Sequence, residues 1–386
     1  MEKKYDYIIA GAGCAGLSLL MRMINDPFFI EKKILVIESA VKNTNDRTWC
    51  FWETEPGIFE PIVHHQWKQL DFFSNYFSGS LDIHPYAYKM IQGIDFYQFV
   101  MNAAAAYKNV SWLHAQIKSI NNSSDLANAQ VALEDGTVIV ADKVFNSILF
   151  APIKVAQHQF YFQQHFKGWL IETTKPCFDA SKATFMDFRV GQEHGTTFMY
   201  VLPVSANKAL IEYTLFTEQL LEKSAYDLAL KNYINDFLKI HDYRIVHEEF
   251  GIIPMTNAPL PRQEGNIIYI GIAGGQAKAS SGYAFKFIQK RTAGIIESLK
   301  NGNPLSAISF SARKGHLYDS VLLRVLHERK LNGDLIFASI FKNVNAADVL
   351  TFLDNESSLF TDLRIMNSVP TGVFLPAAIK ELIPIK

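Results

Sequence analysis

The chain has 386 residues, of which 49% are hydrophobic and 19% charged, and its formal net charge at pH 7 is -1. This length exceeds that of a usual single domain, so we expect two domains or one two-lobed unit with an ample core. The charge balance excludes a general nucleic-acid binder, which needs a marked basic excess, and no apolar run is long enough for a membrane-spanning helix.

The chain opens with an apolar strand, a glycine turn and a helix, in the sequence DYIIAGAGCAG over residues 6–16. Gly11 allows the tight turn, Gly13 lets the backbone approach a pyrophosphate, and Gly16 lets the helix pack on the strand. Because the helix N-terminus then faces the phosphates, the pattern predicts a dinucleotide site. The expected cofactor contacts in this turn are Gly11, Ala12, Gly13, Ala15 and Gly16.

A second strand is expected over residues 34–37, and Glu38 follows it directly. This carboxylate comes about twenty residues after the glycines, where it would accept hydrogen bonds from an adenosine ribose and repel a 2′-phosphate. FAD or NAD is therefore favoured over NADP.

The rest of the first region predicts a nucleotide domain into which a β-meander is inserted before the sheet resumes. A helix is expected over residues 95–107, and strands over 110–120, 130–133 and 143–148, with a hairpin turn at 134–136. The segment NDRTWCFWE over 45–53 is too polar and too aromatic for a routine loop. Its aromatic residues, which suit either a cavity wall or ordinary packing, are Trp49, Phe51 and Trp52.

Longer strands rich in Phe, Tyr, Thr and Val occupy residues 159–217, and a helix is expected over 218–240. Successive antiparallel strands of this kind predict a second sheet that forms the floor or roof of a substrate cavity. The chain holds 29 Phe and 16 Tyr residues. We expect most of them in the core, with an apolar tunnel or a cation-stabilising cavity as the alternative.

A second glycine-rich turn, within NIIYIGIAGGQAKASSGYAF, separates FAD from NAD. A simple NAD dehydrogenase needs one such turn, whereas a two-lobed flavoprotein uses a late strand, turn and helix as well. Backbone N–H groups there would lie near the ribityl chain, the pyrophosphate and the flavin ring. The expected contacts are Gly271, Gly274, Gly275 and Gly282.

The predicted fold class is α/β, a two-lobed Rossmann-like FAD-binding fold with an inserted antiparallel sheet and a helical C-terminal end. The predicted regions are an FAD-binding part with its meander over 1–155, the cavity sheet and helix over 156–245, a return to the FAD-binding region over 246–303, and short helices over 304–386.

Cysteine usage and the N-terminus indicate the compartment. Cys14, Cys50 and Cys177 have neither metal-ligand nor disulfide spacing, so we expect a reducing compartment and no metal. No signal peptide precedes the first strand, so we expect a cytoplasmic protein whose membrane contact is peripheral. Basic residues between Lys278 and Lys342 form a candidate face for anionic lipid, or a solvated helical surface.

The chain resembles the bacterial FAD-dependent lycopene β-cyclases. The resemblance is carried by DYIIAGAGCAGLSL, NDRTWCFWE, ATFMDFRV, FMYVLPVSANKALIEYTLF and IGIAGGQAKASSGYAFKFIQ, in the expected order over nearly the whole chain. Many two-lobed flavoproteins carry Gly-Asp at the late turn, where this chain has Ala273, Gly274 and Gly275. Members of this family also lack that carboxylate, so its absence is no departure.

The resemblance implies a non-redox cyclisation of the ψ end groups of lycopene to β-ionone rings, giving γ-carotene and β-carotene. An acid protonates the end group, the carbocation closes to a ring, and loss of a proton leaves the double bond. Reduced FAD is required but not consumed, and NAD(P)H is the expected reductant. Related acyclic carotenoids, a membrane surface and other carotenoid-pathway enzymes are the implied partners.

The resemblance also assigns site residues. Glu212 in ALIEYT is the family-matched catalytic carboxylate, and Arg47 in DRTW matches a position near the cofactor. From the pattern alone, Glu212 could equally be an outward-facing strand residue or an acid whose pKa is raised by apolar neighbours. Asp187 is a second candidate acid, but Arg189 two residues later favours a structural ion pair, and Asp46 can pair with Arg47.

Two other functions fit the same sequence features. A flavin-dependent monooxygenase or other oxidoreductase acting on an apolar, lipid-like substrate would use the same fold and the same opening turn. A carotenoid- or lipid-binding flavoprotein without catalysis is the alternative in which Glu212 is dispensable.

Overall fold

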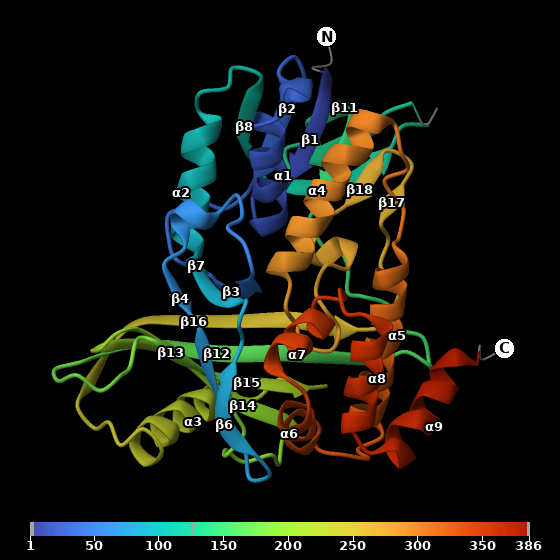
Figure 1. Ribbon diagram of the computed structural model, residues 1–386. Coiled ribbons are helices and arrows are strands. Elements are labelled where there is room, and N and C mark those ends of the chain that lie inside the picture. Colours follow the sequence, from blue (N-terminus) through green and yellow to red (C-terminus); the bar gives the residue numbers. More distant parts are fainter. Residues whose placement is uncertain (1–3, 125–126, 384–386) are drawn as a thin grey trace.

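The computed structural model describes residues 4–124 and 127–383. Two sheets organise the molecule, with the first at the top of Figure 1 and the second crossing its middle. The eight-stranded first sheet has the order β17-β18-β11-β1-β2-β8, and β9 and β10 extend it from β11. Its strands are β1 (Lys4–Ala10), β2 (Ile34–Glu38), β8 (Val110–His114), β9 (Ile117–Asn122), β10 (Ala129–Leu133), β11 (Val138–Asn146), β17 (Gln263–Glu264) and β18 (Ile267–Tyr269).

The centre of this sheet is parallel and covered on both faces. Neighbouring residues of β1 point to opposite sides, so that Ile9 packs in the cluster of helices and Ile8 in the cluster that holds the meander. Both side chains are fully buried, as strands of a parallel sheet usually are. The helices on the Ile9 side are α1 (Cys14–Ile24), α2 (Gly93–Ala104) and α4 (Phe285–Asn301).

The second sheet has seven strands in the order β16-β12-β15-β14-β13-β5-β6. Helix α3 (Lys223–Asp236) packs on one face through Tyr226, Leu230 and Tyr233, and the other face turns toward the first sheet (Figure 1). The strands are β5 (Gln69–Phe73), β6 (Ser78–Asp82), β12 (Tyr161–Thr173), β13 (Lys182–Asp187), β14 (Thr196–Ser205), β15 (Lys208–Thr217) and β16 (Tyr243–Thr256).

A three-stranded sheet, β3-β7-β4, connects the two large sheets. It consists of β3 (Thr48–Glu53), β4 (His65–Trp67) and β7 (Ala87–Gln92). The C-terminal end is helical, as predicted, and none of the helices described in residues 4–124 and 127–383 is long and apolar enough to cross a membrane. Its helices are α5 (Phe310–His327), α6 (Gly333–Asn343), α7 (Ala346–Leu353), α8 (Leu359–Ser368) and α9 (Thr371–Leu382).

The structure differs from the sequence predictions in the bounds of several elements and in the make-up of the second sheet. The single strand expected over 110–120 is two strands, because the chain leaves β8 after His114 and begins β9 at Ile117. The helix expected over 218–240 is shorter, since residues 218–222 form the connection to α3. The second sheet also takes β5 and β6 from the first predicted region, while the division into four regions stays a prediction.

Candidate active site

The first glycine turn joins β1 to α1 and is tightly packed at two of its glycines. Gly11 has φ +96°, and a Cβ there would lie 2.3 Å from Ser147 Oγ. A Cβ on Gly16 would lie 2.0 Å from the Gly11 carbonyl oxygen, so the helix packs against the turn as the pattern predicts. Gly13 faces open space instead, with nothing within 4 Å of the position of a Cβ. A phosphate could approach the backbone there.

Glu38 ends β2 beside this turn. Its Oε2 accepts a hydrogen bond of 2.7 Å from the Ala12 N–H, and its Oε1 accepts one of 2.9 Å from the Ala40 N–H. The Lys42 ammonium lies 3.8 Å from Oε2. The carboxylate is thus fixed at the edge of a cavity of about 540 Å³, named here the nucleotide cavity, which Gly11, Gly13 and Glu38 line.

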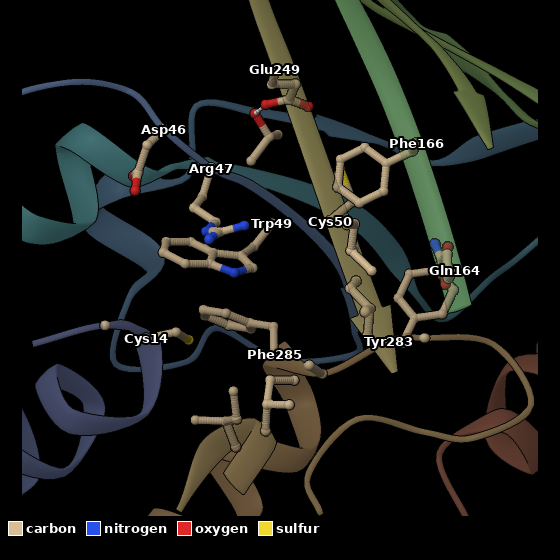
Figure 2. A pocket seen from close by; sticks show the side chains of 18 of the residues that line it. Cys14, Asp46, Arg47, Trp49, Cys50, Gln164, Phe166, Glu249, Tyr283 and Phe285 are labelled. Atoms are coloured by element: carbon tan, nitrogen blue, oxygen red, sulfur yellow. Dashed lines mark hydrogen bonds between the residues drawn. The ribbon is translucent and has the colours of Figure 1, made fainter. Parts of the chain in front are cut away.

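A second cavity of about 390 Å³, named here the central cavity, begins at Gly13 and extends to Glu212 on the second sheet. Figure 2 shows it from close by, with Arg47, Trp49, Tyr283 and Phe285 around it. The nucleotide and central cavities are contiguous, because three residues line both of them. These are Gly13, Lys42 and Ser147.

The late glycine turn borders the central cavity beside the first one. Gly271 has φ +63°, and a Cβ there would lie 3.0 Å from Ala15 Cβ, so the two turns touch. Gly282 has φ +70°, and a Cβ there would lie 1.6 Å from Gln164 Oε1. In the described residues, Gln164 Oε1 and Ser281 Oγ are buried without a hydrogen-bond partner, and both residues line the cavity.

These features fit an extended dinucleotide. The adenosine end suits the nucleotide cavity beside Glu38, the open space at Gly13 suits the pyrophosphate, and the unpartnered polar groups at the late turn suit the ring end. Arg47 and Lys42 supply positive charge to the central cavity.

The structure brings most of the predicted site residues together. Gly13, Ala15, Arg47, Glu212, Gly271 and Gly282 line the central cavity, and Gly11 and Glu38 line the nucleotide cavity. Four others, which line neither cavity, lie within the two turns. They are Ala12, Gly16, Gly274 and Gly275.

Glu212 lies in the middle of β15 and is half-buried in the wall of the central cavity. Burial, followed by the negative charge of Glu249, raises its pKa to about 8. The Thr214 hydroxyl opposes this shift by donating a hydrogen bond of 2.8 Å to Oε1. The carboxyl therefore retains a proton near neutral pH, which the apolar neighbours in the sequence suggest but do not establish.

Glu249 on β16 is a second buried acid, which the sequence predictions miss. Its Oε2 accepts a hydrogen bond of 2.7 Å from the Thr48 hydroxyl, and Figure 2 shows it at the central cavity. Glu212 lines the same cavity. Burial raises its pKa, while the Thr48 hydrogen bond and the charges of His247 and Arg47 lower it. The sequence feature that points to Glu249 is Gly168, because a glycine inside a strand of large residues often marks a place where another group comes close to the backbone.

Aromatic side chains form much of the cavity wall. The hydroxyl of Tyr283 lies 3.1 Å from that of Tyr88 and 3.3 Å from that of Tyr200, all three lining the cavity. Of the three aromatic candidates in residues 45–53, Trp49 alone lines it. Phe51 stacks on Phe285 at 4.3 Å, and Trp52 packs in the core that holds the second sheet.

The remaining predicted acids have structural partners. Asp187 is fully buried, accepts hydrogen bonds of 2.9 and 2.6 Å from Arg189, and accepts one of 2.7 Å from the Tyr233 hydroxyl. Asp46 accepts a hydrogen bond of 2.7 Å from the Tyr97 hydroxyl, and none of the ion pairs among the described residues joins it to Arg47. The Arg47 guanidinium is therefore available to the cavity, contrary to the pairing with Asp46 that the sequence allows.

Most bases of the proposed lipid face are also engaged. Lys278 pairs with Asp319 at 2.8 Å, Lys314 with Asp362 at 2.6 Å, and Arg324 with Glu381 at 2.5 Å. These side chains are largely buried, so they contribute little positive potential to the surface.

Comparisons with known proteins agree with this arrangement. The family model described as "Lycopene cyclase protein" matches residues 6–378. The lycopene beta-cyclase of Pantoea ananas is 26% identical over 298 residues, which are 74% of this chain and 72% of the relative. The lycopene beta-cyclase of Pseudescherichia vulneris is 24% identical over 385 residues, which are 95% of this chain and 94% of the relative.

A solved structure supports the predicted fold class. Pseudomonas aeruginosa PqsL, solved in complex with 2-aminobenzoylacetate, has a TM-score of 0.62 and 14% sequence identity, and the match covers 88% of this chain and 100% of that one. PqsL is described as a probable FAD-dependent monooxygenase. At this identity the likeness shows the fold alone, and it confirms the two-lobed flavoprotein architecture. Because the family model spans nearly the whole sequence, this chain belongs to the lycopene cyclase family.

Proposed function

We propose that the protein cyclises the ψ end groups of lycopene to β-ionone rings, with reduced FAD bound but not consumed. The observation that carries this proposal is the Glu212 carboxyl, which has a pKa raised to about 8 in a cavity contiguous with a dinucleotide turn. An acid with that pKa holds a proton at neutral pH and can donate it to an apolar substrate.

The cofactor contacts follow from the two turns. The first turn and Glu38 would hold the adenosine and pyrophosphate, and Arg47 with the late turn would hold the flavin end. Bound reduced flavin would supply negative charge that stabilises a nearby carbocation. NAD(P)H is the proposed reductant. The proposed contacts are Gly11, Ala12, Gly13, Ala15, Gly16, Glu38, Arg47, Gly271, Gly274, Gly275 and Gly282.

The chain's own residues would move the proton and shelter the cation. Glu212 donates its proton to the terminal double bond, the neighbouring π electrons close the six-membered ring, and loss of a ring proton leaves the new double bond. One proton enters and one leaves, so the substrate keeps its composition. The faces of Trp49 and of the three cavity tyrosines would stabilise the positive charge while excluding water.

The substrate class is proposed from the family and from the surface. Helices α8 and α9 expose a row of apolar side chains, including Phe360 at 71% and Leu363 at 57% exposure. Such a face suits peripheral contact with the membrane in which an acyclic carotenoid dissolves. We propose a cytoplasmic location at that membrane, with other carotenoid-pathway enzymes as possible contacts there.

An anaerobic assay tests the proposal against the monooxygenase alternative. Purified protein with chemically reduced FAD would be given lycopene in liposomes, and the products analysed by absorption and mass spectrometry. We expect a product of unchanged mass and altered absorption. A product two hydrogens lighter or one oxygen heavier would instead identify an oxidoreductase, and no turnover would support the binding protein.

A further inference from the structure

Glu212 and Glu249 are brought together by the register of three strands. In the order β16-β12-β15, the central strand places Gly168 opposite Glu212 on one side and opposite Glu249 on the other. Directly opposed residues of antiparallel strands project from the same face of the sheet. Both carboxyls therefore rise on the cavity face, with only a glycine between them.

The missing side chain at Gly168 leaves the space that Glu249 occupies. A Cβ there would lie 3.0 Å from Glu249 Cγ, 3.4 Å from its Oε1, and 3.1 Å from Leu210 Cδ1. The Glu249 side chain thus lies over β12 toward β15, and its carboxyl and that of Glu212 face the same cavity and interact electrostatically. A hydrogen bond between two carboxyls needs a proton on one of them.

The surroundings favour the proton on Glu212. Thr48 donates to Glu249 Oε2, whereas the buried Oε1 receives a hydrogen bond from none of the N–H or hydroxyl groups in the described residues. That oxygen is an acceptor in position for a Glu212 O–H. Arg47 and His247 add charges that favour the ionised form of Glu249.

The other titratable groups facing the pair are neutral at physiological pH. Burial, followed by the charges of Glu212 and Glu249, raises the pKa of the Cys50 thiol on β3 well above its ordinary value. Burial likewise raises the pKa of three hydroxyls, those of Tyr88, Tyr200 and Tyr283. None of these groups competes with the carboxyls for the proton near pH 7.

We propose that Glu212 and Glu249 share a single proton, with Glu212 as the acid of the cyclisation and Glu249 as the base. This inference rests on the proposed function. The Glu212 O–H bond breaks as a C–H bond forms at the terminal alkene, and the ring C–C bond then closes. A C–H bond next to the resulting cation breaks, and its proton goes to the Glu249 carboxylate. Transfer across a hydrogen bond between the two carboxyls would return the proton to Glu212, so no oxidant or reductant is consumed.

Infrared titration of the purified flavin-loaded protein tests the shared proton without substrate. The C=O stretch of a protonated carboxyl would be followed against pH in wild type, E212Q and E249Q. We expect a band near neutral pH that E212Q removes and that E249Q shifts to lower pH, because the neighbouring negative charge is gone. Glu248→Gln is the matched control, since Glu248 precedes Glu249 but pairs with Lys167 at 3.0 Å and is half exposed.

Cyclisation rates test the assignment of the base. E249Q is expected to lower the rate by at least about 100-fold, the lower range for loss of a general acid or base, while E248Q keeps the wild-type rate. Thr48→Val, which removes the donor to Glu249 without touching either carboxyl, is expected to slow the reaction and to move the infrared titration. It provides a second variant if E249Q does not fold.

Different measurements test cyclisation and the shared proton. Wild-type protein that forms no ring would contradict the proposed function whatever the infrared result. A band that titrates identically in wild type and E249Q would overturn the shared proton, and a wild-type rate in folded E249Q would overturn Glu249 as the base.

Discussion

At the scale of single residues, the Glu212 carboxyl is the acid on which the proposed reaction depends. Burial is the main cause and the adjacent Glu249 charge the second, and together they raise the pKa from an ordinary 4.5 to about 8. The cyclisation rate should therefore be high below pH 8 and fall as the pH rises through about 8, because the protonated form of Glu212 disappears. Glu212→Gln should lower the rate by about 100- to 10,000-fold at neutral pH in the liposome assay.

The same shift affects stability in a predictable direction. Between pH 4.5 and about 8 the folded protein binds a proton at Glu212 that the unfolded chain has released. The contribution of this group to the free energy of unfolding is therefore complete below pH 4.5 and is lost as pH rises through about 8. Urea denaturation across this range should show a smaller decline with pH in E212Q than in wild type. Equal declines would contradict the burial of a protonated Glu212.

At the scale of elements, two glycines in the turn between β1 and α1 have different roles, one in cofactor binding and one in folding. Gly13→Ala adds a methyl group to open space at ordinary φ, so the melting temperature should stay near that of wild type while FAD is lost. Gly16→Ala places its Cβ against the Gly11 carbonyl and should destabilise the protein itself. Thermal denaturation with measurement of bound flavin distinguishes the two. Full flavin content in G13A would contradict the pyrophosphate position.

The sequence predicts the cofactor-binding turns but not the pair of carboxyls. The first turn, Glu38 and the late turn are predictable because each depends on residues close together in the chain, with glycines at fixed spacing. The partnership of Glu212 with Glu249 depends on two strand registers that meet at Gly168, and no local pattern encodes it. The ion pairs that neutralise the predicted basic face are missed for the same reason, since Lys278 and Asp319 meet only in the folded chain.

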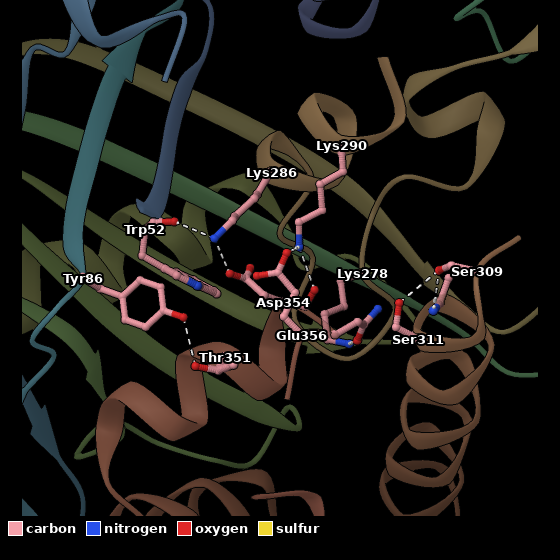
Figure 3. Close-up of polar contacts among 12 residues, drawn as sticks. Trp52, Tyr86, Lys278, Lys286, Lys290, Ser309, Ser311, Thr351, Asp354 and Glu356 are labelled. Carbon is pink, nitrogen blue, oxygen red and sulfur yellow. Dashed lines mark hydrogen bonds and ion pairs between the residues drawn. The ribbon is translucent and has the colours of Figure 1, made fainter. Parts of the chain in front are cut away.

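At the scale of the whole molecule, buried ion pairs join the C-terminal helices to the nucleotide domain. Lys286 on α4 pairs with Asp354 after α7 and donates to the Trp52 carbonyl at 3.2 Å (Figure 3). The Asp354 side chain is 1% exposed, whereas nearby Glu356, paired with Lys290 at 2.8 Å, is 52% exposed.

Removing the buried carboxylate of Asp354 should therefore lower the free energy of unfolding more than removing the exposed carboxylate of Glu356. Asp354→Ala leaves Lys286 without its carboxylate and should lower the free energy of unfolding by about 3 kcal/mol. Glu356→Ala should lower it by less than about 1 kcal/mol. Urea denaturation measures the free energy of unfolding of both variants. Equal losses would contradict a stabilising role of the buried Lys286–Asp354 ion pair.

The apolar face of α8 and α9 is the expected contact with the membrane. Because the basic side chains nearby are paired, flotation with liposomes should depend on apolar contact and persist at raised salt. Replacing Phe360 and Leu363 together by serine should reduce flotation. The same change at Leu228, which is 60% exposed on α3, should not. Flotation that is equal in both variants would place the membrane contact elsewhere.

In the proposed reaction one proton is exchanged for another without oxidation, and a single turnover in D₂O measures this exchange. Enzyme equilibrated in D₂O with reduced FAD would be mixed anaerobically with lycopene, and the product mass measured for each ring formed. We expect the first ring formed by the wild type to gain one deuterium for one hydrogen, and ring formation by E212Q to be at least about 100-fold slower. A cyclised product without deuterium, or one that has lost hydrogen or gained oxygen, would contradict it.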